Sequence, residues 1–328
     1  MKTVDKSYVK YRGGERPSNE AQVVAAHYEL MGGMFAPAFY DGVALSKDPP
    51  QLVGLEKPNM VVARSLMPGL PISPQFPACE TTVRATSLNG LPAVWVVSKN
   101  ADPDRRILFI HGGGYSFGNI FIYQFLMAHL SRATGCAVFA VDYRKAPEFP
   151  YPAGLNDCRD AYSHVLGEGP VGVGEASAIF VMGDSAGGGL TLSLALKLRE
   201  ERLRVPECIV AISPATDLTQ SASSLSPEEK SGGAGMFRGY FGNEPPENPF
   251  VSPLFGDLSG LPPIIIQVSD EEGLRDDSYR FADRAHQAGV NVRLEIWRHM
   301  VHVHQMMVPY LPEANEAIDS IAEFVGQF

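Results

Sequence analysis

The sequence predicts an α/β fold with a mostly parallel central sheet flanked by helices. From about residue 92 the chain alternates short β-branched runs with helical patterns. The runs are continuously apolar and do not alternate with polar residues, which is typical of strands buried on both faces of a parallel sheet. A length of 328 residues, with 45% apolar and 20% charged residues, fits one large globular domain that carries a smaller lid.

Seven apolar runs are predicted as strands, and helical patterns lie between several of them. Residues 189–204 form one predicted helix, which is apolar early and basic in its last turns, as the helix dipole favours. Residues 275–289 form another, with acidic residues first and Gly289 as its C-cap. The succession of strand, helix and strand implies right-handed crossovers. The predicted strands are residues 93–97, 107–110, 137–141, 178–182, 208–212, 263–268 and 292–297.

Two regions do not follow this alternation. One is the segment from residue 1 to about residue 50, and the other is a loop-rich stretch at about residues 215–250. Ligand sites in α/β folds lie at the carboxyl ends of the strands. We therefore expect both regions to contribute to a lid over that edge of the sheet.

The charge and the cysteine content narrow the range of partners and compartments. The chain has 37 acidic and 27 basic residues and a net charge of −10, which would repel a phosphate backbone, so we expect no nucleic-acid partner. No apolar run approaches the ~18 residues of a membrane span, and the N-terminus lacks an apolar signal region. Scattered cysteines without CxxC spacing favour free buried thiols in a reducing, cytoplasmic compartment: Cys79, Cys136, Cys158 and Cys208.

The pentapeptide GDSAG, residues 183–187, places Ser185 between a predicted strand and a predicted helix. This is the G-x-S-x-G pattern in the position that a nucleophilic serine requires. A serine in a strained strand-to-helix turn projects its Oγ above the sheet, and its neighbours must be small so that the backbones can pack. The alternative is a glycine-rich turn that caps a helix or binds a phosphate, because five-letter motifs recur by chance.

A second glycine motif, HGGGYSFG at residues 111–118, follows the strand predicted at 107–110. Backbone N–H groups exposed there could complete an oxyanion hole with the N–H of Ala186, and glycine lets a substrate approach the main chain closely. The alternative is again a phosphate loop, but the stretch lacks the GKS or GKT ending of a P-loop and the GxGxxG spacing of a dinucleotide site. Two motifs of one mechanism, each after a predicted strand, favour nucleophilic catalysis by Ser185.

A nucleophilic serine needs a base to take its proton and an acid to hold that base, and in one recurring chain order both follow the serine. His286 lies in a predicted helix, whereas three later histidines cluster in RHMVHVHQ, residues 298–305, after a strand. The acid is expected in SDEEGLRDD, residues 269–277. Most of its five carboxylates are expected to be solvated or to lie at a helix N-terminus, and spacing alone does not choose among them.

The clustered histidines also allow a metal site as an alternative. His299, His302 and His304 lie within six residues, which brings three nitrogen ligands close together in the sequence. A fourth ligand or a carboxylate at matching spacing is not evident, however. We therefore expect no metal and no cofactor.

The chain resembles the hormone-sensitive-lipase-like branch of the α/β-hydrolases, the bacterial and fungal esterases marked by HGGG and GDSAGG. The resemblance covers nearly everything from about residue 80 to residue 310. It implies an α/β-hydrolase fold with a small helical cap: residues 1–50 as an N-terminal cap segment and residues 51–328 as the catalytic domain, with a cap-contributing insertion at about 215–250. The stretches that carry it are HGGGYSFG (111–118), DYRKAPEFPYPAGLND (142–157), GDSAGG (183–188), SPATDLT (213–219) and NPFVSPLFGDLSGLPPIIIQ (248–267).

The resemblance also implies a role for each site residue. The family's acid begins a D/E-x-L-x-D element, here EGLRD, which gives the acid role to Glu272. Its histidine follows a GMxH-like turn, here HMVH, which selects His302 as the base for the nucleophile Ser185. The implied activity is a serine carboxylesterase that hydrolyses short-chain or small-molecule esters without a cofactor. The implied oxyanion donors are the N–H groups of Gly113, Gly114 and Ala186.

The chain departs from the family pattern at two positions near the site. Ala215 in SPATDLT replaces a common aromatic residue, so we expect a widened pocket or lid wall. His299 stands where the turn before His302 usually has glycine. Neither departure removes a catalytic group, and His111 is implied to orient the oxyanion loop.

Several alternatives stay open from the sequence. An amidase, formamidase or lactone hydrolase would use the same triad, whereas a non-catalytic small-molecule receptor of this fold would lack the triad histidine that this chain has. Peptidases of this fold usually carry an aromatic residue where this chain has Asp184, which disfavours that activity. Asp270 or Asp276 would be the acid if the local alignment shifts. A homodimer is also an expectation, because an edge strand such as residues 292–297 can pair across a two-fold axis.

Overall fold

The computed structural model describes residues 6–22, 24–25, 81–227, 230 and 237–328. Among these residues, one nine-stranded sheet has the order β1-β11-β10-β9-β8-β4-β5-β3-β2. Its neighbouring strands are parallel except for β2 with β3 and β3 with β5. All seven predicted strands are confirmed, as β3 (Leu91–Ser98), β4 (Asp102–Ile110), β5 (Cys136–Val141), β8 (Ala178–Asp184), β9 (Cys208–Ile212), β10 (Ile264–Ser269) and β11 (Val292–Trp297).

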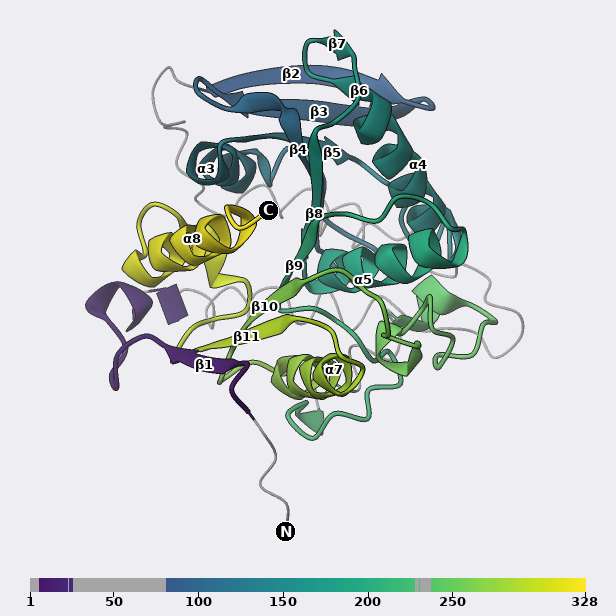
Figure 1. Ribbon diagram of the computed structural model, residues 1–328. Coiled ribbons are helices and arrows are strands. Elements are labelled where there is room, and N and C mark those ends of the chain that lie inside the picture. Colours follow the sequence, from purple (N-terminus) through teal and green to yellow (C-terminus); the bar gives the residue numbers. More distant parts are fainter. Residues whose placement is uncertain (1–5, 23, 26–80, 228–229, 231–236) are drawn as a thin grey trace, which may run out of the picture.

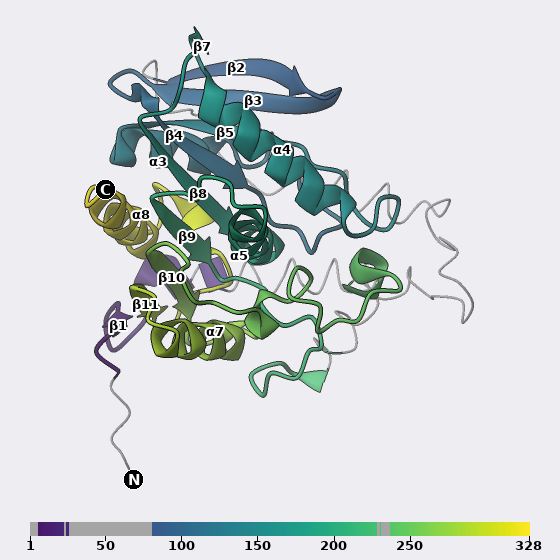
Figure 2. The ribbon, with the colours of Figure 1, turned by 45° about the vertical axis from the view of Figure 1, so that its right-hand side comes forward.

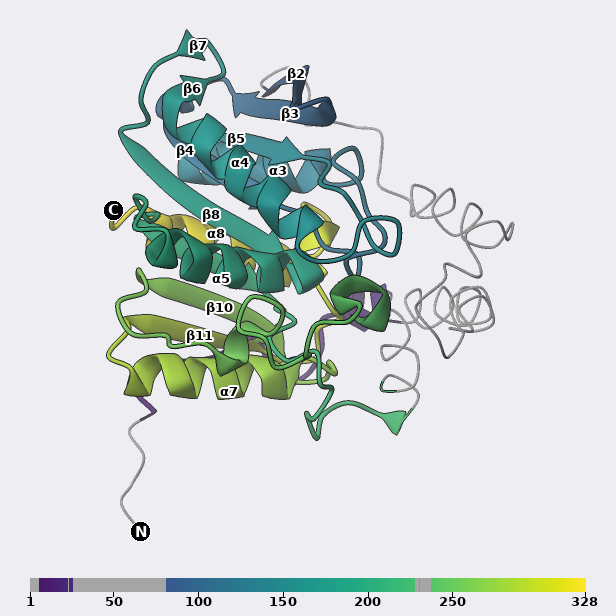
Figure 3. The same ribbon diagram turned by 90° about the vertical axis from the view of Figure 1, so that its right-hand side faces the viewer.

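Helices cover both faces of the sheet (Figures 1 and 2). On one face lie α3 (Gln124–Thr134) and α8 (Pro312–Val325), which contact each other. On the other face lie α4 (Ala153–Gly167), α5 (Ser185–Glu200) and α7 (Arg275–Gln287), which follow one below another in Figure 3. The apolar core therefore forms two layers, one on each side of strands that are themselves buried on both faces.

The two predicted helices are present with shifted ends. The helix expected at 189–204 begins at Ser185, because the glycines that follow the serine are helical and form its first turn. The helix expected at 275–289 ends at Gln287. Gly289 then adopts a φ of 79°, and its N–H donates to the His286 carbonyl at 3.0 Å, so it terminates the helix as predicted.

An additional strand, β1 (Val9–Arg12), covers the edge at which β11 would otherwise end the sheet. It runs parallel to β11, with Val9 opposite Leu294, and the Arg12 guanidinium contacts the buried Glu295 carboxylate at 2.8 Å. The expectation that residues 292–297 form an edge strand is therefore wrong. A four-residue strand with a mixed polar pattern carries too little periodicity to be predicted from sequence.

The opposite edge is formed by β2 (Thr81–Leu88), which pairs with β3. Its side chains are mostly exposed, so it lacks the continuous apolar run that reveals the central strands. A separate short hairpin of β6 (Glu168–Gly169) and β7 (Gly172–Val173) follows α4. Arg84 of β2 donates a hydrogen bond to the Pro170 carbonyl in that hairpin at 2.6 Å, which ties the hairpin to the edge strand.

The strand register brings five strand ends to one edge of the sheet. Ile110 of β4 lies opposite Gly183 of β8, and Asp184 lies opposite Ile212 of β9. At the same edge Ser269 of β10 lies opposite Trp297 of β11. The loops that leave these strands carry HGGG, Ser185, SPATDLT, SDEEGLRDD and RHMVH, so motifs far apart in the sequence meet here.

The two predicted lid regions are described in part. Most of the predicted N-terminal cap segment, residues 26–50, lies outside the described residues, and its described part runs along β11 (Figure 1). The described part of the insertion at 215–250 is mostly loop, with a helical turn at 237–241. Tyr240 in that turn stacks on Tyr115 of the HGGG loop, with ring centroids 3.9 Å apart, so the insertion packs beside the predicted site.

Within the described part of the chain, no helix combines the length and the apolar character that crossing a membrane requires. Three of the four cysteines are described, and each is a free thiol. All three are buried, as the sequence predicts. They are Cys136, Cys158 and Cys208.

Candidate active site

Ser185 lies at the sharp turn between β8 and α5. Its φ of 53° is in the left-handed region, which is unfavourable for a residue with a side chain. Asp184 before it is extended, with φ −120° and ψ 148°, so the chain changes direction within one residue. Ser185 is half-buried while its neighbours on both sides are buried, which leaves the serine as the accessible point of the turn.

The glycines around Ser185 make room for this turn. A Cβ on Gly183 would lie 2.5 Å from the Gly187 carbonyl oxygen. A Cβ on Gly187 would lie 2.5 Å from the carbonyl oxygen of His111, at the start of the HGGG loop. Because real Cβ atoms do not approach that closely, any larger residue at either position would push β8, α5 and the HGGG loop apart.

Asp184 ties the serine turn to the HGGG loop, a role that was not predicted from the sequence. Its Oδ1 accepts the Gly112 N–H at 2.9 Å, and its Oδ2 accepts the Tyr123 hydroxyl at 2.8 Å. The side chain is 1% exposed, and burial raises the pKa of its carboxyl to about 6. Asp184 occupies a variable position of the G-x-S-x-G pattern, so no sequence signal indicates this bridge.

The HGGG loop folds back on itself and presents main-chain atoms toward the sheet edge. Gly113 and Gly114 have φ values of 117° and 58°, and the Gly113 carbonyl accepts the Phe117 N–H at 2.7 Å. Among the described residues, no hydrogen-bond acceptor is found for the N–H groups of Gly113, Gly114 or Ala186. These three donors lie on the two segments that Asp184 joins.

His111 is buried beneath this loop and supports it. Its ring stacks on Tyr143 with centroids 4.5 Å apart, and the Tyr143 hydroxyl donates to the His111 carbonyl at 2.9 Å. Burial lowers the pKa of His111, so the ring is neutral at neutral pH. These contacts agree with the orienting role that the sequence resemblance implies.

Glu272 and His302 meet at the same sheet edge. The Nδ1 of His302 contacts Glu272 Oε2, and the Glu272 side chain is buried whereas the His302 side chain is 31% exposed. Glu272 Oε1 accepts the Ser213 hydroxyl and the Ser269 N–H, each at 2.7 Å. Three donors therefore hold this carboxylate, and Ser213, with a φ of 45°, is a further contact that was not predicted from the sequence.

Burial raises the pKa of Asp184, and the charge of a protonated His302 opposes that rise, which places His302 in electrostatic reach of the residue before Ser185. The other candidate acids face elsewhere. Asp270 Oδ1 accepts the His299 N–H at 2.9 Å, and Asp276 accepts the Ser224 N–H at 2.9 Å. Glu272 is thus the carboxylate of this stretch that the structure brings to His302.

The five carboxylates of SDEEGLRDD are more engaged than the sequence suggests. Asp276 and Asp277 do lie in the first turn of α7, as expected. Asp277, however, is 1% exposed and accepts the N–H groups of Thr216 and Asp217, each at 2.9 Å. Burial raises its pKa to about 6. Asp277 is thus a helix N-terminal carboxylate, as expected, but a buried one, and Glu272 is the buried carboxylate that contacts His302.

The three clustered histidines do not converge on one point. His302 contacts Glu272, His299 Nδ1 lies 2.8 Å from Glu271 Oε1, and His304 is buried beside Trp297. One group of three potential metal ligands does occur among the described residues, with its donor atoms within 4.8 Å of one another. It combines His299 with Asp270 and Glu271, which leaves His302 and His304 out of it.

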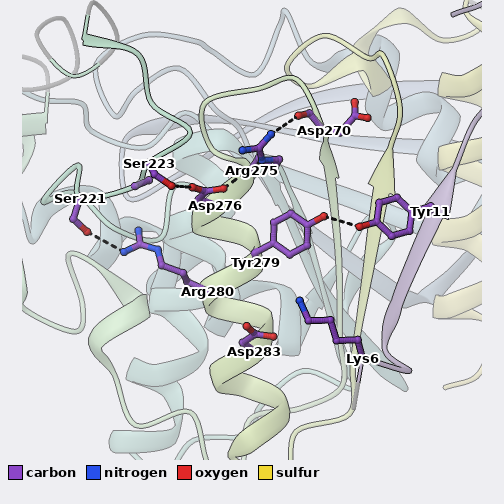
Figure 4. A pocket seen from close by; sticks show the side chains of 11 residues that line it. Lys6, Tyr11, Ser221, Ser223, Asp270, Arg275, Asp276, Tyr279, Arg280 and Asp283 are labelled. Atoms are coloured by element: carbon purple, nitrogen blue, oxygen red, sulfur yellow. Dashed lines mark hydrogen bonds and ion pairs between the residues drawn. The ribbon is translucent and has the colours of Figure 1, made fainter. Parts of the chain in front are cut away.

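An open hollow of about 680 Å³ lies away from Ser185, against α7 and β1 (Figure 4). Its arginines already have partners: Arg275 lies 3.3 Å from Asp276, and Arg280 donates to Ser221 at 2.9 Å and to Asp217 at 2.7 Å. Tyr11 and Tyr279 approach each other across it at 3.3 Å. The described lining is Lys6, Tyr11, Ser221, Ala222, Ser223, Asp270, Arg275, Asp276, Tyr279, Arg280 and Asp283. The lining includes none of the predicted triad of Ser185, Glu272 and His302.

The sheet, the serine turn and the acid–histidine contact are those of one family of enzymes. A family model described as alpha/beta hydrolase fold matches residues 107–306, from within β4 to just beyond His302. The matched stretch contains both glycine motifs and the acid and histidine loops. The chain therefore belongs to the α/β-hydrolases.

Individual relatives narrow the family further. An esterase of Acinetobacter venetianus is 35% identical over 76% of this chain and 83% of its own length. An acetyl-hydrolase of Streptomyces hygroscopicus is 36% identical over 71% of this chain and 79% of its own length. A crystal structure of an esterase from the bacterial hormone-sensitive lipase family superposes with a TM-score of 0.76 and 30% identity, over 95% of this chain and 99% of that one. The chain is a carboxylic ester hydrolase of the hormone-sensitive-lipase family, as its motifs predict.

Proposed function

We propose that the protein is a serine carboxylesterase that acts through Ser185, His302 and Glu272. The observation that carries this proposal is the contact between buried Glu272 and His302 at the edge where Ser185 heads α5 in a strained turn. The acid fixes the proton on Nδ1 of the imidazole, which leaves Nε2 as the base. Ser185 needs such a base, and it lies at the same edge of the sheet as His302, after the carboxyl end of β8.

The reaction follows from these positions in two halves. Ser185 Oγ attacks the ester carbonyl carbon while His302 takes the hydroxyl proton, and Glu272 stabilises the imidazolium. His302 then gives the proton to the leaving alkoxide, which departs and leaves an acyl-enzyme. In the second half His302 deprotonates a water that attacks the acyl group, releases the acid and restores the serine. The developing oxyanion is held by the N–H groups of Gly113, Gly114 and Ala186.

We infer that the substrates are short-chain or small-molecule carboxylic esters. The similarity to an acetyl-hydrolase supports a small acyl group. Ala215, expected to widen the pocket, is 2% exposed and packs in one apolar cluster with Tyr115 and Tyr240. Its N–H donates to the Ser185 carbonyl at 3.0 Å. A small residue at position 215 would thus change acyl selectivity through the packing behind Ser185.

Residues 1–50 and the insertion at about 215–250 are proposed to form the cap over this site, with residues 51–328 as the catalytic domain. The stacking of Tyr240 on Tyr115 supports a contact between the insertion and the oxyanion loop. The buried free thiols of Cys136, Cys158 and Cys208 support a reducing, cytoplasmic compartment. A homodimer would need a surface other than β11, since β1 covers that strand.

Ser185→Ala tests the proposal with p-nitrophenyl acetate and butyrate as substrates. We expect turnover to fall by about 10⁴-fold or more, because the nucleophile of a triad cannot be replaced by its partners. The matched control is Ser163→Ala, an exposed serine on α4 whose hydroxyl bonds only within its own helix, and which should keep full activity.

Two results would overturn the proposed function. Ser185→Ala turning over esters at the wild-type rate would exclude Ser185 as the nucleophile, and a fluorophosphonate probe that fails to label the wild-type serine would agree. A panel of matched ester, amide and lactone substrates tests the reaction class. Faster turnover of the amide or the lactone than of the matched ester would contradict a carboxylesterase.

A further inference from the structure

His299 has a backbone conformation that its residue type makes costly. It lies three positions before His302, where the family pattern has glycine, and its φ is 60°. A non-glycine residue in the left-handed region is uncommon, and surrounding contacts must hold it there. The contacts of the His299 side chain and of its main chain are therefore what keeps this conformation in place.

The imidazole of His299 joins three segments of the molecule. Its Nδ1 lies 2.8 Å from the Glu271 carboxylate, on the loop that carries Glu272. Its Nε2 lies 3.2 Å from the Glu15 carbonyl oxygen, in the N-terminal segment that follows β1. Its own main-chain N–H donates to Asp270 at 2.9 Å. One side chain thus connects the histidine loop, the acid loop and the N-terminal segment.

Both ring nitrogens of His299 face atoms that only accept hydrogen bonds. A neutral imidazole has one N–H and can serve one such acceptor, whereas the imidazolium serves two. The adjacent Glu271 carboxylate raises the pKa of His299, which favours the imidazolium. The contacts therefore select the charged form of this residue.

Two elements besides its own contact His299. The acid loop contributes the Asp270 and Glu271 carboxylates, and the N-terminal segment contributes the Glu15 main-chain carbonyl. Arg275, which follows the acid loop at the start of α7, donates to the Asp270 main-chain carbonyl oxygen at 2.9 Å. On the histidine loop itself, the Arg298 guanidinium lies over the Tyr11 ring, 5.5 Å from its centroid. Negative charge thus predominates around the imidazole.

The same two loops are joined by contacts on either side of His299. The Ser269 hydroxyl donates to the Met300 carbonyl at 2.6 Å, and Glu272 contacts His302. The N-terminal segment and the histidine loop also share one apolar cluster, which includes Ala21, Met300 and Val303. Removal of the His299 hydrogen bonds would therefore act on the relative position of Glu272 and His302.

We propose that His299, as an imidazolium, is a positioning residue that fastens the loop of His302 to the loop of Glu272 and to the N-terminal segment at Glu15. The inference rests on the proposed function, because the pair it positions is the proposed acid and base. It gives the enzyme a dependence on pH that a glycine at this position would lack. On the alkaline side, loss of one proton removes one of the two hydrogen bonds and loosens the pair.

The test compares kcat and KM across the acid, neutral and alkaline range for wild type and four variants. His299→Gly removes both side-chain hydrogen bonds and is expected to lower kcat at neutral pH by about tenfold with little change in KM, since small displacements of catalytic groups cost rate. His299→Arg keeps two donors that do not titrate, so it should retain most of the activity and lose the alkaline decline. Glu271→Gln should move that decline to lower pH, and His286→Gln, a partly exposed histidine on α7, is the control that changes nothing.

A histidine NMR titration, run in the Ser185→Ala protein, separates this inference from the proposed function. We expect two ring N–H groups on His299 at neutral pH and a pKa above the ordinary histidine value of 6.5, whether or not Ser185 is the nucleophile. A neutral His299 ring would overturn the inference, and so would an unchanged kcat and pH profile in His299→Gly. A profile that changes on addition of EDTA would also overturn it, because a metal rather than a proton would then lie between His299 and Glu271. Active Ser185→Ala protein would instead overturn the proposed function alone.

Discussion

The nucleophile region and the acid–base region of this enzyme are built in different ways. Around Ser185 the geometry is main-chain geometry, set by glycines that leave no room for a side chain and by one buried carboxylate. Around Glu272 and His302 two loops are joined side chain by side chain, and both Glu271 and His302 reach solvent. The first region is therefore fixed by packing, and the second by hydrogen bonds that pH and substitution can change.

Because of this difference, the two regions should differ in how well they tolerate substitutions. A larger residue at Gly183 or Gly187 would displace whole elements, because the nearest atoms are backbone atoms. In the acid–base region, removal of one hydrogen bond leaves several others in place, since Glu272 alone accepts from three donors. We expect a substitution in the first region to lower the rate by displacing the main chain. In the second region, we expect each substitution to lower the rate by the amount that its own hydrogen bonds contribute.

The largest effect that sharpens this comparison is expected from Glu272→Gln. The neutral amide keeps the size of the side chain but no longer fixes the imidazole tautomer or stabilises the imidazolium, so kcat should fall by about 10³- to 10⁴-fold. Measured kcat for p-nitrophenyl butyrate checks this. Asp270→Asn and Asp276→Asn are the matched controls, because both carboxylates face main-chain donors that an amide oxygen also accepts. Loss of activity in either control, with Glu272→Gln active, would move the acid role to that residue.

A smaller effect is expected at Asp184, which joins the two halves of the nucleophile region. Asp184→Ala releases the Gly112 N–H and should lower kcat by about 10²-fold, comparable to the loss of one oxyanion donor. Asp184→Asn should stay within a few-fold of wild type, because its amide oxygen still accepts that N–H and the Tyr123 hydroxyl can turn to accept from the amide. If both variants lost activity equally, the activity would depend on the charge of Asp184 and not on its hydrogen bond to the Gly112 N–H.

The nucleophile region could be predicted from sequence because its constraints are local. A strained turn needs small neighbours within two residues of Ser185, and a main-chain oxyanion loop needs consecutive glycines, so both requirements appear as contiguous motifs. The central strands are predictable for a similar reason, since burial on both faces leaves unbroken apolar runs. In these segments the local chemistry and the overall fold require the same residue types.

The acid–base region could be predicted only in outline, because its contacts join residues far apart in the chain. Nothing in SDEEGLRDD distinguishes Glu272 from its neighbours except its distance to His302 and Ser213 in three dimensions. The resemblance to a family supplied that choice. The link from His299 to Glu15 spans nearly the whole chain, through a strand too short to show a period. Such long-range hydrogen bonds leave no local pattern.

The smallest of these effects concerns stability in acid, and it belongs to the acid–base region. His304 follows His302 by two positions, is 1% exposed, and burial lowers its pKa to about 3 from an ordinary value of 6.5. Between these values the unfolded chain binds the proton that the folded chain excludes. The contribution of His304 to stability is therefore complete above pH 6.5 and is lost progressively as the pH falls toward 3.

His304→Gln removes this titration and tests the sign. The free energy of unfolding of wild type, measured by urea titration at several pH values below neutrality, should fall more steeply with acid than that of the variant, by up to about 1.4 kcal/mol per pH unit for one proton. Asp184, whose pKa burial raises to about 6, acts in the opposite direction but equally in both proteins, so it cancels from the difference. Parallel curves for the two proteins would mean that His304 is protonated in the folded state. The buried ring beside Trp297 would then contribute nothing to the acid sensitivity of the protein.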